Sequence, residues 1–260
     1  MNERSNDIKV DGFARPASLA LLKNVVATMG LVQRLTDRGA HMPGFGVVFG
    51  HSGYGKTYSA IFAQNKTLGP RVEVGDSWSK KTLVCAILKE LGIRQPKGTI
   101  PALTEQAIEI MAAPGHPPLI IDEADRLVDK NMIELVREMQ EGAQVPIILI
   151  GEEALPQKLE RVERVHNRVL DWVMAQPADL EDTRKLAALF CPSLPIDDAS
   201  LEVIRRASDG RARRIVTNLY HLKEFAAVRG LAAIEVGGPL PDFTTGKAPK
   251  RHGDIVRKVA

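Results

Sequence analysis

Short apolar runs alternate with longer amphipathic segments through the first two thirds of the chain. Five of these runs are bounded by turn-forming residues and are typical of buried strands: 45–49, 71–74, 119–122, 146–150 and 169–173. Between and beside them, apolar residues recur at helical spacing in 57–64, 80–91, 101–113, 131–141 and 155–167. This alternation predicts an α/β fold with a mostly parallel, five-stranded sheet that helices cover on both faces.

The pattern changes after Pro177. Three helical segments follow without another convincing strand, at 179–190, 198–207 and 213–229, and they predict a small all-helical unit. One more amphipathic helix, at 17–38, precedes the sheet. We therefore divide the chain into an N-terminal tail and linker helix (1–40), an α/β core (41–177), a helical unit (178–232) and a flexible basic tail (233–260).

The composition is that of an ordinary soluble globular protein, with 44% hydrophobic and 26% charged residues. No apolar run approaches the roughly 20 residues that cross a bilayer. The polar start of the chain does not resemble a signal peptide. Cys85 and Cys191 are far apart and lack metal-ligand spacing, so we expect small buried side chains rather than functional thiols. These features predict a cytoplasmic protein with no membrane partner.

Positive charge gathers toward the C-terminus. The whole chain has a net charge of +3, but residues 205–260 hold 12 Lys or Arg against 5 Asp or Glu. This surplus favours an anionic partner such as nucleic acid, and a solvated helix face with a soluble tail is the alternative. Aromatic residues make up only 5% of the chain, which argues against a stacking platform for single-stranded nucleic acid.

The run from 50 to 57 carries the strongest chemical signal. It matches Gly-x-x-x-x-Gly-Lys-Thr at every fixed position and lies between a predicted strand and a predicted helix. Its glycines let backbone N–H groups face the phosphates of ATP, and the following helix adds its dipole. We expect Lys56 to reach the β- and γ-phosphates and the Thr57 hydroxyl to bind Mg²⁺. The predicted ATP-binding residues are Gly50, His51, Ser52, Gly53, Tyr54, Gly55, Lys56 and Thr57.

A pair of carboxylates ends the third predicted strand. The run Pro118-Leu-Ile-Ile is followed directly by Asp122 and Glu123. Together with the glycine-rich loop, this pair predicts a site in which Asp122 holds Mg²⁺ through water and Glu123 polarises the attacking water. Phosphoryl transfer needs little else from a protein beyond positioning and charge compensation.

These motifs resemble those of the AAA+ ATPases, a P-loop NTPase family, over roughly residues 45–229. The resemblance implies a five-stranded parallel core with the Asp-Glu pair on its third strand, and a small C-terminal helical lid, which we assign to 178–232. It also implies a lid arginine that contacts the γ-phosphate. The string Gly210-Arg-Ala-Arg-Arg-Ile fits that position. We assign the role to Arg213, with Arg214 as the alternative.

The family also supplies an arginine finger from a neighbouring subunit, between the fourth and fifth strands. Arg161, Arg164 and Arg168 lie in that part of the chain, and their spacing of three and four predicts a shared helical face. Arg168, directly before the fifth predicted strand, fits the family position best, and Arg164 is next. The resemblance therefore implies a homo-oligomer.

One position departs from the family pattern. AAA+ proteins usually place a neutral polar residue near the end of the fourth strand, where it orients the water. Here Gly151 is followed by Glu152, and a carboxylate near the γ-phosphate is repelled unless it is paired or protonated. Glu152 either positions the water with an altered pKa or points away from a site that hydrolyses ATP slowly. We favour the second interpretation, which suits a switch.

Within the family, the layout most resembles the transposition ATPases, meaning the B proteins of Mu-like transposable phages and related transposon ATPases. The resemblance rests on the short linker helix, the Ile-Leu-Ile-Gly-Glu-Glu-Ala-Leu string at 148–155, the arginines before the fifth strand and the lid string. It implies ATP-dependent assembly on duplex DNA as a helical filament, recruitment of a transposase to target DNA, and release after hydrolysis that the transposase stimulates. It also implies the cytoplasm of a bacterium or phage-infected host.

Basic residues at two places could neutralise DNA phosphates without sequence preference. Lys80 and Lys81 follow the second predicted strand, although an ordinary solvated helix start explains them as well. The tail contributes Lys247, Lys250 and Arg251.

Three other functions remain open. The first is a remodelling or secretion-type AAA+ ATPase that acts on a protein partner. The second is a replication initiator or helicase loader, which sequence separates poorly from the transposition ATPases. The third is a small-molecule kinase, against which the Asp-Glu pair and the arginine-bearing helical unit argue.

Overall fold

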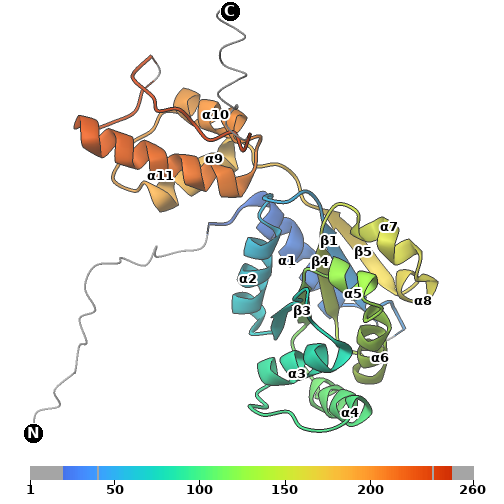
Figure 1. The fold of residues 1–260 in the computed structure, drawn as a ribbon. Coiled ribbons are helices and arrows are strands. Elements are labelled where there is room, and N and C mark those ends of the chain that lie inside the picture. The colour runs from blue at the N-terminus through green and yellow to red at the C-terminus, as the bar shows by residue number, and fades with distance from the viewer. Residues whose placement is uncertain (1–19, 40, 236, 248–260) are drawn as a thin grey trace, which may run out of the picture.

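The computed structural model describes residues 20–39, 41–235 and 237–247 (Figure 1). The core contains a five-stranded sheet in the order β2-β3-β4-β1-β5, and every pairing in it is parallel. The strands are β1 (Phe45–Phe49), β2 (Arg71–Glu73), β3 (Leu119–Asp122), β4 (Ile147–Gly151) and β5 (Val169–Met174). Each strand lies within one residue of its predicted bounds, so the predicted sheet is confirmed.

Eight helices of the described residues belong to the core, and three form the lid beyond it (Figure 1). The core helices are α1 (Lys23–Thr36), α2 (Lys56–Thr67), α3 (Lys80–Glu90), α4 (Ile100–Met111), α5 (Asp125–Asp129), α6 (Ile133–Ala143), α7 (Leu155–Glu160) and α8 (Glu163–His166). The lid helices are α9 (Leu180–Phe190), α10 (Asp198–Ala207) and α11 (Ala212–Arg229).

Alternate residues of the central strands pack against different helices. Ile148 and Ile150 of β4 join the cluster beneath α1 and α2, whereas Ile147 and Leu149 join the larger cluster on the opposite face. This period of two is what a strand buried on both faces requires. Gly46 permits close packing on the α1 side, because a Cβ atom there would lie 2.6 Å from a methyl carbon of Leu35.

The segment between β4 and β5 differs from the single helix predicted at 155–167. The chain forms two short helices, α7 and α8, and Val162 separates them because its φ of −115° and ψ of 73° are not helical. Val162 packs against the main core, which holds the break in place. Arg161 ends the first helix, Arg164 lies within the second and Arg168 follows it. The prediction that these three arginines share one helical face is therefore wrong.

The lid ends later than predicted, because part of the predicted flexible tail packs against it. Ile234 is 3% exposed and forms a parallel bridge with Ile196. Farther along, the Asn218 side chain bonds both backbone groups of Thr244, at 2.8 and 3.1 Å. Phe243 packs against the hydrophobic cluster of the lid that contains Ile234. Ile234, Phe243 and Thr244 thus attach this segment to the lid through apolar packing and hydrogen bonds that the Gly- and Pro-rich composition conceals.

Other expectations from the composition concern cysteine and membrane segments. Cys191 is buried, and its thiol donates to the backbone oxygen of Leu219. Cys85 is half-buried against the main core. Within the described ranges, no helix combines the length and apolar character that crossing a membrane requires.

Ile234→Ala tests whether the segment after α11 stabilises the lid. Removing a buried isoleucine side chain should lower the free energy of unfolding by about 2–5 kcal/mol, measured by denaturant titration. Val228→Ala is the matched control, because Val228 is 88% exposed on α11 and should change stability by less than about 0.5 kcal/mol. Equal stabilities for the two variants would contradict the packing.

Candidate functional site

The loop between β1 and α2 wraps around an open centre at the carboxyl edge of the sheet. Gly50, Gly53 and Gly55 have φ values of +148°, +89° and +85°, which residues with side chains rarely adopt. Gly55 directly precedes α2, so the first N–H groups of that helix border the loop. Free N–H groups and the helix dipole make this geometry a binding site for anions.

Lys56 lies at the start of α2 with its ammonium group folded into the loop. The Nζ atom donates to the backbone oxygens of Gly50 at 2.6 Å and His51 at 2.9 Å. Burial lowers the pKa of Lys56, and the carboxylates of Glu152, Asp122 and Glu123 act in the opposite direction. A bound anion beside Lys56 would offset the cost of burying its charge.

Asp122 ends β3 and faces the loop with a buried carboxylate, only 3% exposed. Burial raises the pKa of Asp122. Hydrogen bonds from the Glu123 N–H and the Thr57 hydroxyl, and the nearby charge of Arg71, lower it. Arg71, at the start of β2, lies 3.5 Å from the carboxylate and also pairs with Glu73. The side chains of the predicted Mg²⁺ ligands, Thr57 and Asp122, lie close enough to interact.

Glu123 turns the chain sharply after β3. Its φ of +57° is unusual for a residue with a side chain and indicates local strain, which is common at functional sites. The carboxylate is partly exposed and lies 3.7 Å from the Arg126 guanidinium. Partial burial raises the pKa of Glu123 and Arg126 lowers it, while Asp122 and Glu152 raise it further.

The end of β4 is fixed by a buried aspartate, Asp125, to which the sequence motifs assign no role. Asp125 Oδ2 accepts a 2.6 Å hydrogen bond from the Glu152 backbone N–H, and its other oxygen lies 3.5 Å from Lys158 Nζ. Gly151 makes room for this contact, since a Cβ atom there would lie 2.3 Å from Asp125 Oδ2. Asp125 therefore holds the backbone that carries Glu152 beside the loop.

A cavity of about 400 Å³ joins these groups to the lid. One side is polar and contains Lys56, Thr57, Asp122, Glu123 and Glu152. The other side is mainly apolar and is formed by Leu22, Tyr58, Leu186, Phe190, Val216 and Tyr220. The division suits a ligand with a charged phosphate end and a flat apolar end.

The residues that line this cavity fit a nucleoside triphosphate with Mg²⁺. The loop offers N–H groups and one lysine to phosphate oxygens, and Thr57 with Asp122 provides the few oxygen ligands that Mg²⁺ uses beside a phosphate chain. The cost of burying Asp122, visible in its raised pKa, is what a cation there would offset.

Comparisons with known proteins agree with this geometry. A family model described as AAA domain matches residues 40–159. The chain has the AAA P-loop fold. Orc1 of Aeropyrum pernix, solved in complex with DNA, is 16% identical with a TM-score of 0.61, covering 84% of this chain and 64% of that one. Cdc6p of Pyrobaculum aerophilum is 18% identical with a TM-score of 0.61, covering 85% and 66%.

The Holliday junction branch migration motor RuvB of Thermotoga maritima is 19% identical with a TM-score of 0.57, covering 85% of this chain and 69% of that one. At these identities the likeness concerns the fold alone. The chain spans slightly less than two thirds of the Orc1 and Cdc6p chains. No curated protein sequence matches the chain. The predicted AAA+ fold is confirmed, while nothing in these comparisons is specific to transposition ATPases.

Arg211 and Arg213 of the lid approach the glycine-rich loop, whereas Arg214 does not. Arg213 lines the cavity, and its backbone N–H donates to Gly53 O at 3.4 Å. Arg211 was not predicted, yet its Nη1 donates to Ser52 O at 2.6 Å and its guanidinium lies 6.0 Å from the Tyr54 ring centroid. Arg214 instead packs against Gly246. This placement favours Arg213 over Arg214 for the lid role.

His51 and Tyr54, two further loop residues, contact each other, and His51 also contacts the segment after β4. His51 Nδ1 lies 2.9 Å from Glu153 Oε2, and the His51 ring packs edge-on against Tyr54. His51 thus connects the loop to the segment after β4, and Ser52 and Tyr54 connect it to Arg211 of the lid.

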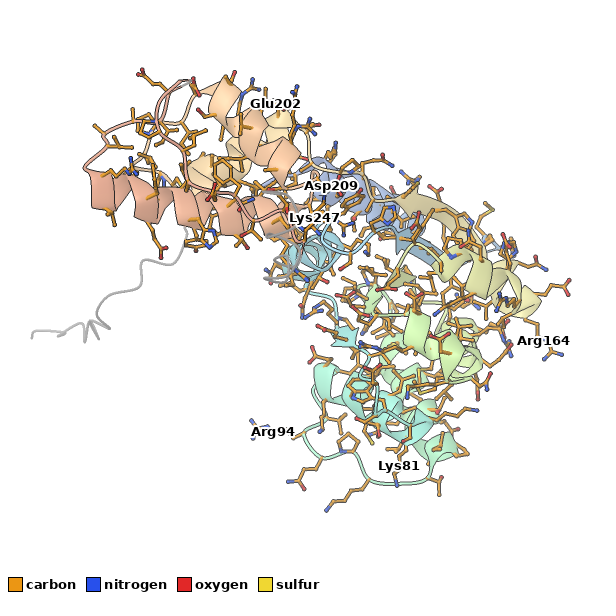
Figure 2. The ribbon with its side chains drawn as sticks, turned by 45° about the horizontal axis from the view of Figure 1, so that its top comes forward. Lys81, Arg94, Arg164, Glu202, Asp209 and Lys247 are labelled. Carbon is orange, nitrogen blue, oxygen red and sulfur yellow. The ribbon has the colours of Figure 1, made fainter. Side chains whose placement is uncertain are left out.

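Arg168, the first choice for the finger, lies at the edge of the sheet away from the loop. Its backbone oxygen accepts from Phe45 N, at the amino end of β1, and its side chain pairs with Glu141 of α6. Arg164 projects outward from the core (Figure 2). Neither arginine reaches the loop of its own chain, so a role for them in the site needs a second chain.

The basic residues predicted to contact DNA are separated in space. Lys80 and Lys81 are exposed at the start of α3, and Figure 2 shows Lys81 and Arg94 at the end of the core far from the lid. Lys247 belongs to the lid, next to Gly246 and its Arg214 contact. Lys250 and Arg251 lie outside the described residues.

The raised pKa of Asp122 predicts a gain in stability for Asp122→Asn without nucleotide. A raised pKa in the folded state means that stability falls as pH rises through that pKa. The neutral amide avoids this cost, so the variant should resist denaturant better than the original protein at pH 7. The advantage should vanish below about pH 4, where the carboxyl is protonated in both states. A less stable variant at pH 7 would show that the Arg71 and Thr57 contacts outweigh the burial.

Proposed function

We propose that the chain is an ATPase that binds Mg²⁺–ATP between its core and its lid. The observation that carries this proposal is the glycine loop with Lys56 facing the buried Asp122 and the adjoining Glu123 across one cavity. The apolar side of the cavity, with the Phe190 and Tyr220 rings 5.6 Å apart, would receive the base. The polar side would receive the phosphates.

Each polar residue has a role in the proposed hydrolysis. Loop N–H groups and Lys56 bind the β- and γ-phosphates, and Thr57 with Asp122 would hold Mg²⁺, which would neutralise charge on the phosphate oxygens. Glu123 orients a water molecule toward the γ-phosphorus and accepts its proton as the bond to the β-phosphate oxygen breaks. Arg213 stabilises the γ-phosphate from the lid.

Glu152 is the group that sets the expected rate. It lines the cavity with Lys56 and Glu123, which supports the interpretation in which Glu152 faces the site rather than pointing away from it. Its negative charge raises the proton affinity of Glu123 but also opposes the approach of the γ-phosphate. We infer slow turnover that a partner accelerates.

We further propose that the ATP form assembles on duplex DNA and that hydrolysis releases it. The positive surplus of residues 205–260 and the exposed Lys80 and Lys81 support this proposal. Two proteins of similar fold also point in this direction. Orc1 was solved in complex with DNA, and RuvB is described as a Holliday junction branch migration motor.

The most specific form of the proposal is delivery of target DNA to a transposase in the cytoplasm of a bacterium or phage-infected cell. This form rests on the resemblance of the motif strings at 148–155 and 210–215 to those of transposition ATPases. Self-assembly would supply Arg168, or Arg164, to the site of the next subunit. The alternative is a remodelling, helicase-loading or secretion-type ATPase that acts on a protein, and DNA-independent activity would favour it.

Two substitutions separate nucleotide binding from hydrolysis. Lys56→Ala removes a charged contact to the phosphates and should weaken ATP binding at least about tenfold. Glu123→Gln should retain ATP binding but lower hydrolysis by roughly a hundredfold or more. Calorimetry measures the first and phosphate release the second. Unchanged turnover in Glu123→Gln would overturn the assignment of Glu123 as the base.

A pelleting assay with duplex DNA tests the assembly. DNA should sediment with the protein in ATP and much less in ADP, without sequence preference. Replacing both Lys80 and Lys81 by Ala should reduce the slope of log affinity against log salt by about 2. Lys66→Ala, on the exposed surface of α2, is the control and should leave the slope unchanged. Absence of assembly in ATP at low salt would contradict the DNA proposal.

A further inference from the structure

Asn24, in the first turn of α1, joins two segments that lie far away in the sequence. Its Nδ2 atom donates to Tyr54 O in the glycine loop and to Gln176 O after β5, each at 2.8 Å. Its Oδ1 atom accepts from Gln176 N at 2.9 Å. Asn24 is only 6% exposed, so both amide hydrogens and the amide oxygen are used inside the protein.

The contact with Tyr54 fixes the direction of the next N–H group. A trans peptide is planar, and its C=O and N–H bonds point in opposite directions. None of the described peptide bonds is cis. Because Asn24 holds the Tyr54 C=O toward α1, the N–H of Gly55 in the same peptide points away from α1, into the loop. Gly55 lines the cavity, where that N–H can donate to a phosphate oxygen.

The contact with Gln176 ties this peptide to the start of the lid. Gln176 follows β5 and precedes Ala178, whose N–H donates to Gly210 O in the lid at 2.8 Å. Since Asn24 bonds both the N–H and the C=O of Gln176, the segment between β5 and α9 cannot shift without losing two hydrogen bonds. Buried polar contacts of this kind are costly to break.

The lid in turn holds the first turn of α1. Leu22, the residue before α1, provides no side-chain cap. Instead, Asp182 of α9 accepts a 2.9 Å hydrogen bond from Lys23 N, one of the helix's otherwise unpaired N–H groups. Lys23 Nζ also lies 3.2 Å from Asp179. The lid therefore sets the position of the residue adjoining Asn24.

We propose that Asn24 is a positioning residue that orients the Gly55 N–H toward the phosphates and couples the loop to the lid. This inference rests on the proposed nucleotide binding. It assigns to Asn24 no direct contact with the nucleotide. Its effect passes through the Tyr54–Gly55 peptide.

The test compares Asn24→Ala and Asn24→Asp with two controls. Asn24→Asp keeps the size of the side chain and the acceptor for Gln176 N, but loses the donor to both Tyr54 O and Gln176 O. Thr28→Val removes a buried hydroxyl that donates to the Asn24 backbone oxygen, and it keeps the Asn24 side-chain amide that bonds the loop. Gln176→Ala keeps the backbone groups that Asn24 bonds and removes a side chain that donates to Met174 O at 3.2 Å. Affinity for ADP is measured by calorimetry, and melting temperature without nucleotide reports general stability.

Both Asn24 variants should bind ADP about tenfold or more weakly, while Thr28→Val and Gln176→Ala should remain within about twofold of the original protein. Hydrogen exchange supplies a second readout. ADP should protect the amides of 50–57 in the original protein and the controls, and less so in the Asn24 variants at saturating ADP. A variant that is merely less stable is not expected to lose the protection that saturating ADP gives to the amides of 50–57.

The outcomes separate the two proposals. If the original protein binds ADP and Lys56→Ala binds it at least about tenfold more weakly, the nucleotide site stands. Asn24 variants that then bind ADP and protect 50–57 normally would overturn the positioning role alone. An affinity loss no larger than that of Thr28→Val at the same change in melting temperature would overturn it as well. If the original protein shows no ADP binding that depends on Lys56, both proposals fail.

Discussion

The site depends on one electrostatic constraint, which is that Lys56 is partly, and Asp122 almost completely, withdrawn from water at the same edge of the sheet. Burial lowers the pKa of the first and raises the pKa of the second, so each charged form is disfavoured by its surroundings. Internal contacts with loop carbonyls, Thr57 and Arg71 offset part of this cost. An anionic phosphate chain with a divalent cation complements both groups at once.

The fold places these charges together through the order of its strands. β4 lies between β1 and β3, so the loop after β1 and the carboxylates after β3 lie on either side of the end of β4. That end carries Gly151 and Glu152, and Asp125 fixes its backbone. The lid closes the remaining side, where Arg211 and Arg213 contact the loop. The ends of β1, β3 and β4 and the N-terminal end of α11 therefore surround the cavity.

The sequence predicted the parts of the site whose chemistry depends on local order. The loop, the Asp-Glu pair and all five strands follow from short patterns, since strand, turn and helix determine where backbone N–H groups point. Asn24 could not be found in this way, because its partners are 30 and 152 residues away and an asparagine in a helix carries no distinctive pattern. Arg71 and Arg211 were missed for the same reason. The break at Val162 and the packing of Ile234 depend on tertiary burial that overrides local composition.

The arginines between β4 and β5 show how assembly would change the balance of charge around the proposed phosphate site. Within one chain, Arg168 is neutralised by Glu141, and it lies at the edge of the sheet opposite the loop. In the proposed oligomer it would exchange that partly exposed pair for the phosphates of a neighbour. Exposed ion pairs contribute little to stability, so the exchange costs little. A γ-phosphate adds negative charge beside Glu152, and an arginine from the next subunit would compensate for it. Nucleotide state and assembly would then be linked through the same set of charges.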